Sequence, residues 1–272
     1  MFNNKSTIAP PPERDFKIKK GFTLAEVLIT LGIIGVVVTL LLPIIATNIS
    51  KKKIAAKVKK DYTTLNLTIG MAETDYGDTT NWEYKSYDEL ENWIKTYILP
   101  YVQYSKFCNR DCGLGGYHSL GYNPKSNNAN PRIPRYTVIL NNGAIWTFYR
   151  SQGTYSHQTK IVVYVGKKLP KLGYWYAGID AFSFIFDSEE THPHIRPFQV
   201  PSTSNGTNLY TPWRKIYYPT IDRATLLSKQ TKCGCAQNSG ACYGYNISGD
   251  YCSAVLLMDN WEFKKDYPWK RY

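Results

Sequence analysis

The sequence predicts an α+β protein in which a long N-terminal helix packs on an antiparallel β-sheet of about four strands. Three observations lead to this fold class. Residues 27–50 form a run of 24 residues without a formal charge, mostly Val, Leu and Ile. Apolar residues then recur at helical spacings of three and four. Further along come short β-rich runs, two of which flank an Asn-Gly turn.

The composition is that of a folded chain with its positive charge concentrated in one region. The 272 residues are 43% hydrophobic, which is enough for a packed core. Of the net charge of +12, residues 1–21 contribute +3 and six lysines lie between positions 51 and 60. Residues 61–272 carry 22 Lys and Arg against 18 Asp and Glu, so the remainder of the chain is nearly balanced.

The uncharged run has the length of a membrane-spanning helix. At 1.5 Å per residue, 24 residues extend about 36 Å, more than the hydrocarbon core of a bilayer. A secretory signal has a shorter apolar core, of about 7–15 residues. A buried helix of a soluble protein is the alternative, but such helices usually have a polar face. Five Lys and Arg precede the run and six Lys follow it, so charge does not predict its orientation.

The start of the run contains a glutamate in an apolar setting. Residues 19–29 read Lys-Lys-Gly-Phe-Thr-Leu-Ala-Glu-Val-Leu-Ile. A carboxylate at this position is costly in hydrocarbon and needs a partner. This stretch resembles the processing signal of type IV prepilins and of the pseudopilins of type II secretion, in which basic residues and a glycine precede Phe-Thr-Leu and a glutamate.

The resemblance implies roles for four residues. A prepilin peptidase is expected to cut after Gly21 and to methylate the new N-terminus at Phe22. Glu26 is expected to pair with the terminal amine of a neighbouring subunit during assembly. Pro43 lies where many of these helices carry a proline, and it removes the backbone hydrogen bond to Thr39, which would loosen the helix.

The implied protein is a pilin-like subunit of a pilus or pseudopilus filament, with three segments. Residues 1–21 are a leader peptide, residues 22–76 a long helix with its transmembrane half at 22–50, and residues 77–272 an extracytoplasmic globular domain. The chain would span the inner membrane before assembly and then lie in an extracellular or periplasmic filament. Expected partners are the prepilin peptidase, other pilin subunits, the inner-membrane assembly machinery and membrane lipid. A type II secretion pseudopilin is one alternative, and a membrane-anchored binding protein or enzyme is another.

Beyond the apolar run, the helix should continue to a stop at Gly77. Residues that share one face of it are Ile54, Val58, Tyr62, Leu65 and Ile69. The lysines at 51–60 would contact anionic headgroups or form a solvated collar. A capping box at Ser86 and Glu89 predicts a second helix. Its expected buried residues are Leu90, Trp93, Ile94 and Tyr97.

The sheet is expected to start with a hairpin. Residues 136–140 and 144–149 are its strands, and Asn142-Gly143 supplies the positive φ angles of a tight turn. Residues 161–165 and 181–186 are two further strands, the second with one buried face. Residues 99–134 are interpreted as a surface connection, and residues 261–269 as a terminal strand or arm.

The six cysteines are expected to form disulfides, because an even count in an extracytoplasmic domain favours them. They are Cys108, Cys112, Cys233, Cys235, Cys242 and Cys252. The one-residue spacer between Cys233 and Cys235 disfavours a bond between them on geometric grounds, which leaves twelve of the fifteen pairings open. Zinc is the alternative, but Cys233-x-Cys235 lacks the usual spacer and has no histidine nearby.

No enzymatic motif is present in the sequence. It contains no nucleophile elbow, phosphate loop, metalloprotease signature or dinucleotide fingerprint. His192 and His194 could bind a metal with nearby carboxylates, although a solvated loop is the simpler interpretation. The 15% aromatic residues lack the concentrated basic charge of a stacking site for nucleic acid. We therefore expect no catalysis, no cofactor, no metal and no specific nucleic-acid partner.

Cleavage at Gly21 gives the first testable prediction. The mature chain should begin at methylated Phe22, and Gly21→Leu should accumulate uncut precursor because the peptidase has to approach the backbone closely. Intact-mass spectrometry of membrane-extracted protein measures both. A mature chain starting at another residue, or an uncut wild-type chain, would contradict the interpretation.

Overall fold

The structure is a computed structural model of the chain. It divides into two compact units, Met1–Asn48 and Ile49–Tyr272, which are described separately apart from the helix that runs through both. The described residues are 21–82, 89–110, 112–114, 117–118, 136–150, 158–165, 175–187, 195–197, 222–230, 234–237 and 249–268.

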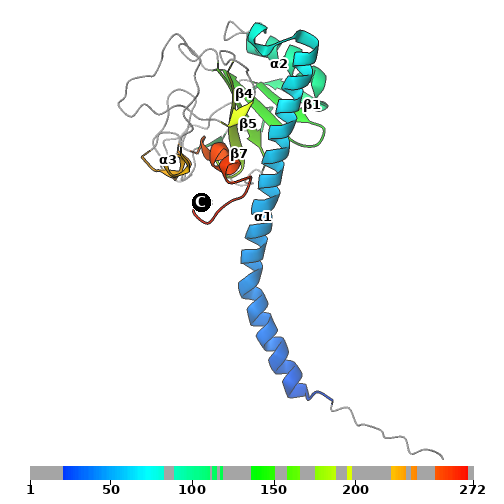
Figure 1. The fold of residues 1–272 in the computed structure, drawn as a ribbon. Helices are drawn as coiled ribbons and strands as arrows, with labels where there is room; N and C mark the ends of the chain where they lie inside the picture. Colours follow the sequence, from blue (N-terminus) through cyan, green and yellow to red (C-terminus); the bar gives the residue numbers. More distant parts are fainter. Residues whose placement is uncertain are drawn as a thin grey trace, which may run out of the picture. The chain divides into compact units, whose positions relative to one another are not determined.

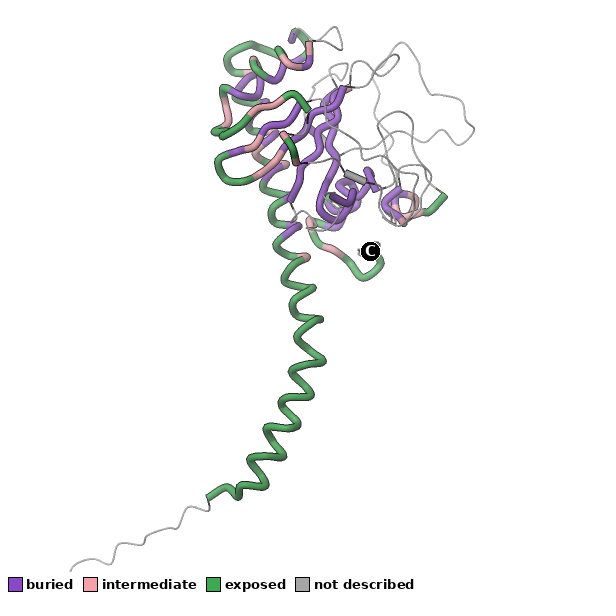
Figure 2. Tube along the Cα trace, turned by 180° about the vertical axis from the view of Figure 1, so that it is seen from behind, coloured by how far each residue is buried: buried purple, intermediate pink, exposed green. Residues whose placement is uncertain are grey.

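Helix α1 (Leu24–Tyr76) is the first element, and its surroundings change along its length. Residues 24–50 are exposed throughout, and burial begins at Ile54 (Figure 2). The helix ends before Gly77, whose φ of +76° is the left-handed geometry of a glycine stop. From Ile54 onward one face is buried, which confirms the expected stripe. Its apolar members are Ile54, Ala55, Val58, Leu65, Ile69 and Ala72.

An antiparallel sheet of six strands packs against this face of α1 (Figure 1). Its spatial order is β1-β3-β4-β5-β7-β8. The strands are β1 (Tyr104–Asn109), β3 (Tyr136–Leu140), β4 (Ile145–Arg150), β5 (Gln158–Tyr164), β7 (Ala181–Asp187) and β8 (Arg196–Pro197). Two short segments, β2 (Tyr117–His118) and β6 (Trp175–Tyr176), form a separate parallel pair. The α+β class and the arrangement of helix on sheet are therefore as predicted.

The four expected strands are β3, β4, β5 and β7, and the described sheet contains two more, β1 and β8. The interpretation of residues 99–134 as a surface connection was wrong for β1, which pairs with β3 from Tyr104 opposite Leu140 to Asn109 opposite Tyr136. Strand β1 lies at the edge of the sheet and has no buried residue, so it lacks the alternation that identifies a strand. Strand β8 has only two residues, too few for any pattern.

The β3–β4 hairpin is confirmed, with a different turn from the one expected. Among the turn residues only Gly143 has a positive φ, of +81°. The Asn142 side chain instead accepts a hydrogen bond from the amide of Ala144 at 2.9 Å. The turn therefore spans three residues, in which the asparagine acts through its side chain and the glycine through its backbone.

Both faces of the central strands are covered. Phe182, Phe184 and Phe186 of β7 belong to the core on the α1 side, where Tyr62 stacks on Phe184 at 5.4 Å. A second cluster contains Tyr149, Val162, Tyr164, Trp175, Ala177 and Ala181. All seven residues of β7 are buried, so the expectation of one buried face was wrong. Ser183 is polar but is buried in a hydrogen bond to Asp250, so a polar residue in this strand did not mark a face exposed to water.

The second helix, α2 (Leu90–Tyr97), has the four buried residues expected of it. Its aromatic residues pack with Trp82, which stacks on Tyr97 at 4.1 Å, and with Phe186 of the sheet. Single 3-10 turns lie at Thr79–Asn81 and Leu99–Tyr101. Glu89 is the N-cap residue of α2, and Ser86 of the predicted capping box lies outside the described residues, so the capping box stays a prediction.

Two short helices near the C-terminus were not expected. They are α3 (Arg223–Leu227) and α4 (Cys252–Met258). Arg223 bridges the two aspartates that follow α4, with contacts to Asp259 at 2.7 Å and to Asp266 at 2.6 Å. These contacts raise the pKa of Arg223 and lower that of Asp266.

The terminal segment is an arm and not a strand. Phe263 packs 6.3 Å from Phe182, and Tyr267 is buried. No described residue after Met258 is in a strand. The prediction for residues 261–269 is thus confirmed as an arm, and the strand alternative was wrong.

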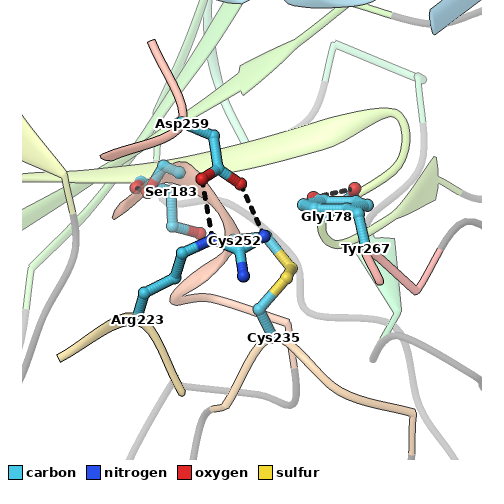
Figure 3. Close-up of a disulfide and its surroundings, with 8 residues drawn as sticks. Gly178, Ser183, Arg223, Cys235, Cys252, Asp259 and Tyr267 are labelled. Carbon is cyan, nitrogen blue, oxygen red and sulfur yellow. Dashed lines mark hydrogen bonds and ion pairs between the residues drawn. A yellow bond between two sulfur atoms is a disulfide. The ribbon is translucent and has the colours of Figure 1, made fainter. Parts of the chain in front are cut away.

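Gly178 allows the closest backbone approach in this part of the fold (Figure 3). Its φ is +76°, and its carbonyl accepts a hydrogen bond from the Tyr267 hydroxyl at 2.5 Å. A Cβ at this position would lie 2.4 Å from the Sγ of Cys252 and 3.0 Å from its Cβ. No side chain larger than hydrogen fits without displacing the disulfide.

Gly178→Ala should therefore destabilise the protein by about 2–4 kcal/mol, combining left-handed strain with overpacking. Gly143→Ala is the matched control, because its φ of +81° is similar but no atom lies within 4 Å of the added Cβ. The control should cost only about 1 kcal/mol. Thermal unfolding of the oxidised full chain in detergent measures both. Equal losses would show that the contact with Cys252 does not matter.

Asp61 is a charged residue on the buried face of α1, with only 5% of its surface exposed. Burial raises its pKa from 3.8 to about 6, an effect that Trp146, Lys60 and Lys57 partly offset. The folded state therefore binds a proton more tightly than the unfolded state does. Stability should fall as the pH rises from about 4 to 6, and the penalty should then remain constant.

Asp61→Asn should remove most of this pH dependence. The shift in pKa corresponds to about 3 kcal/mol, so the variant should be more stable than wild type above pH 6 by up to that amount. At pH 4 the two proteins should unfold at nearly the same temperature. Parallel stability curves across this pH range would contradict the assignment.

Candidate processing and assembly site

The expected cleavage point lies in an accessible, non-helical segment. Residues 21–23 precede α1, which begins at Leu24. Phe22 is 88% exposed, and no atom lies within 4 Å of a Cβ placed on Gly21. A peptidase could therefore approach the Gly21–Phe22 bond from several directions without unwinding a helix.

Glu26 caps the first turn of α1 together with Thr23. Its Oε2 accepts a hydrogen bond from the Thr23 amide at 2.8 Å and another from the Thr23 hydroxyl at 2.9 Å. The Thr23 hydroxyl oxygen in turn accepts from the Glu26 amide at 3.2 Å. This reciprocal arrangement is a capping box, and it places the carboxylate at the positive end of the helix dipole.

The capping box leaves part of the carboxylate available. Both hydrogen bonds go to Oε2, and Oε1 accepts none from the described residues. A cation from outside this chain could therefore bind at Oε1 without breaking the cap. Thr23 was missed as a site residue, although the spacing Thr23-x-x-Glu26 is visible in the sequence and is the signature of this motif.

Helix α1 continues without interruption through Pro43. The hydroxyl of Thr47 donates to the Pro43 carbonyl at 2.8 Å, and that of Thr39 donates to the Val36 carbonyl at 2.7 Å. Such bonds satisfy hydroxyl groups within the helix and suit an apolar environment. Whether Pro43 loosens the helix stays a prediction.

The apolar half of α1 fits membrane anchoring. Among the described residues, α1 is the one helix long and apolar enough to cross a bilayer, with a mean hydropathy of 2.8 over its most apolar 18 residues. None of that window is buried in the protein. The large apolar side chains between Val27 and Ile49 are 42–67% exposed.

Four of the six cysteines form two disulfides. Cys108 at the end of β1 bonds to Cys112, and Cys235 bonds to Cys252 at the start of α4. The second bond fastens α4 to the segment after α3 (Figure 3). Cys233 and Cys242 lie outside the described residues. Both pairs are among those that the sequence left open.

No group of three or more potential metal ligands occurs within the part of the chain that the structure describes. His192 and His194 lie outside that part. The described residues do include a buried ion pair, between Lys160 and Asp250 at 2.6 Å. Ser183 donates to the other carboxylate oxygen at 2.7 Å, so both oxygens of Asp250 have partners in a buried structural network.

Two family models match the chain in adjacent segments. Residues 44–271 match a model described as a family of unknown function (DUF6613). The chain belongs to this family. Residues 16–42 match the prokaryotic N-terminal methylation motif, which confirms the resemblance to type IV pilins and pseudopilins.

The second match supports a type IV pilin-like or pseudopilin-like protein. The matched segment contains Gly21, Phe22 and Glu26, for which the resemblance to prepilins implies roles in processing and assembly. No curated protein and no solved structure matches the chain.

Proposed function

We propose that this member of the family is a filament subunit that is cleaved after Gly21, methylated on Phe22 and assembled through α1. The observation that most supports this proposal is the environment of Glu26. This residue lies inside the methylation motif, in the first turn of an exposed apolar helix, and its Oε1 is available to a cation from another chain. Its role is assembly and not catalysis.

The exposed apolar half of α1 supports this proposal, because it requires an apolar environment. Lipid supplies that environment before assembly, and neighbouring helices can replace lipid in a filament core. The exchange of lipid for protein costs little, since both are apolar. A carboxylate is different, because a filament core offers no water to a charge.

Glu26 therefore needs a cation when the helix leaves the membrane. Cleavage at Gly21 would create one, the methylated amine of Phe22. A second subunit can present its amine to Oε1, which the capping box leaves available. The proposed pairing thus neutralises one charge per subunit and sets the position of each subunit relative to the next.

The proposal also includes the location of the globular part and the partners of the chain. The globular part would be extracytoplasmic, which agrees with its two disulfides. Partners would be the prepilin peptidase, other pilin-like subunits and the inner-membrane assembly machinery. A surface pilus and a type II secretion pseudopilus use the same chemistry at Glu26.

Glu26→Leu tests the proposal directly. The variant should be inserted and cleaved with a normal mass, because it leaves the peptidase site and the apolar run intact. Its filament yield should fall by at least about tenfold, since an unpaired terminal amine replaces a neutral pair. Intact-mass spectrometry of the membrane fraction and recovery of sheared filaments provide the two measurements.

Glu91→Leu is the matched control, because it removes a carboxylate from α2 and should leave both measurements unchanged. Normal filament yield from Glu26→Leu as the sole copy would exclude the proposed pairing. Failure of cleavage would mean that Glu26 serves processing. Filaments sheared from the surface indicate a pilus, whereas loss of exported enzymes on deletion indicates a secretion pseudopilus.

A further inference from the structure

Four of the six lysines that follow the apolar run share one face of α1. They are Lys52, Lys53, Lys59 and Lys60, and all four are exposed. Each of the first two lies seven residues, or about two turns, before one of the last two, so their side chains start from the same side of the helix. The buried residues of this stretch, such as Ile54, lie on the opposite side, in the core with the sheet. We call these four residues the lysine face.

The side chains of the lysine face make no salt bridge with any described residue. The next acidic residue of α1 is Asp61, which is buried against the sheet. The other two lysines differ, because Lys57 donates to the Val165 carbonyl at 3.3 Å and Lys51 is half-buried. Four exposed like charges along about 12 Å of helix repel one another, so the lysine face favours an anionic partner.

The place of the lysine face along the chain indicates what this partner is. It begins two residues after the uncharged run of residues 27–50, so the surface beside it is the headgroup layer of the bilayer that this run would span. Anionic headgroups attract basic residues close to the end of a membrane-spanning helix. Insertion of the helix is enough to bring the lysines to lipid, whereas an acidic protein would have to be recruited there.

The length of the lysine face restricts how the helix can meet the membrane. On a helix perpendicular to the bilayer, with Ser50 at the hydrocarbon boundary, Lys60 lies about 15 Å outside that boundary. The headgroup layer on one side is only about 5–7 Å thick. Lys52 would then lie inside this layer and Lys60 beyond it. All four lysines contact headgroups together only if this part of α1 is inclined, with the lysine face toward the bilayer.

We propose that the lysine face binds anionic phospholipid headgroups and holds residues 51–76 of α1 inclined over the bilayer surface before assembly. The sheet packs on the opposite face of the helix, so it lies away from the lipid and does not obstruct the contact. The contact thereby sets the direction in which the globular part leans. This inference goes beyond the proposed function, because it requires α1 in a membrane but neither cleavage nor filament formation.

Photocrosslinking of the full chain tests the contact. Ala56 is exposed and lies in the middle of the lysine face, so benzoylphenylalanine in its place should form lipid adducts in vesicles of equal parts phosphatidylcholine and phosphatidylglycerol. Mass spectrometry measures the yield of adducts, which should be at least about threefold lower in phosphatidylcholine alone. Thr74 is the matched control position, because it is exposed on the same side of the helix five turns further along. Benzoylphenylalanine at that position should give no lipid adduct.

Removal of charge tests the lysines themselves. Lys59→Gln with Lys60→Gln should lower the adduct yield from position 56 at least about threefold, because the inclined arrangement depends on this outer pair. High salt should lower the wild-type yield in the same direction, since it screens exposed charges. Lys229→Gln with Lys265→Gln is the matched control, because it removes two exposed lysines from the globular part. This control should leave the yield unchanged.

Three outcomes would overturn the inference. Equal yields in the two kinds of vesicle would show that the contact does not depend on anionic lipid. A normal yield after removal of the outer lysine pair would show that these lysines are only solvated. Adducts to a protein in place of lipid would show that an acidic partner occupies the lysine face. The proposed function is tested separately by cleavage and by Glu26→Leu, and its failure would leave the adduct yields unchanged.

Discussion

The packing of one face of α1 on the sheet is the interaction on which the rest of the structure depends. From Ile54 to Ala72 this face supplies a continuous row of buried side chains, and Tyr62 stacks on Phe184. Each large aliphatic side chain buried here contributes roughly 1.5–3 kcal/mol. This packing joins the second half of α1 and the sheet in one hydrophobic core.

The two halves of α1 suit different environments, an apolar one and water, and the composition of the helix changes accordingly. Residues 27–50 have no polar face, so they suit lipid or other helices. From residue 51 the lysines mark the return to water, and from Ile54 one face becomes core. Glu26 is the exception in the apolar half. Its capping bonds to Thr23 reduce the cost of the charge without fully satisfying the carboxylate.

The globular unit contains buried charged residues. Their neighbours offset the free-energy cost of burying these charges to different degrees. Lys160, Asp250 and Ser183 form a buried network that joins β5 and β7 to the residues just before α4. Removing one member would leave a buried charge unpaired. Asp61 has weaker compensation, which is why its pKa is raised to about 6. The Cys235–Cys252 disulfide and the close approach of Gly178 hold the C-terminal part against this same region.

Local patterns in the sequence determined the long helix, its buried face, helix α2, the hairpin and the processing motif. Each depends on residues close together in the chain, such as the spacing from Ile54 to Ile69 or the Thr23-x-x-Glu26 box. Tertiary structure decided the features that depend on partners far along the chain. Strand β1 exists because it pairs with β3, β7 is buried on both faces because other elements cover it, and Cys235 bonds to Cys252 because folding brings them together. Spacing and composition cannot encode such contacts, since they report only the neighbours of each residue along the chain.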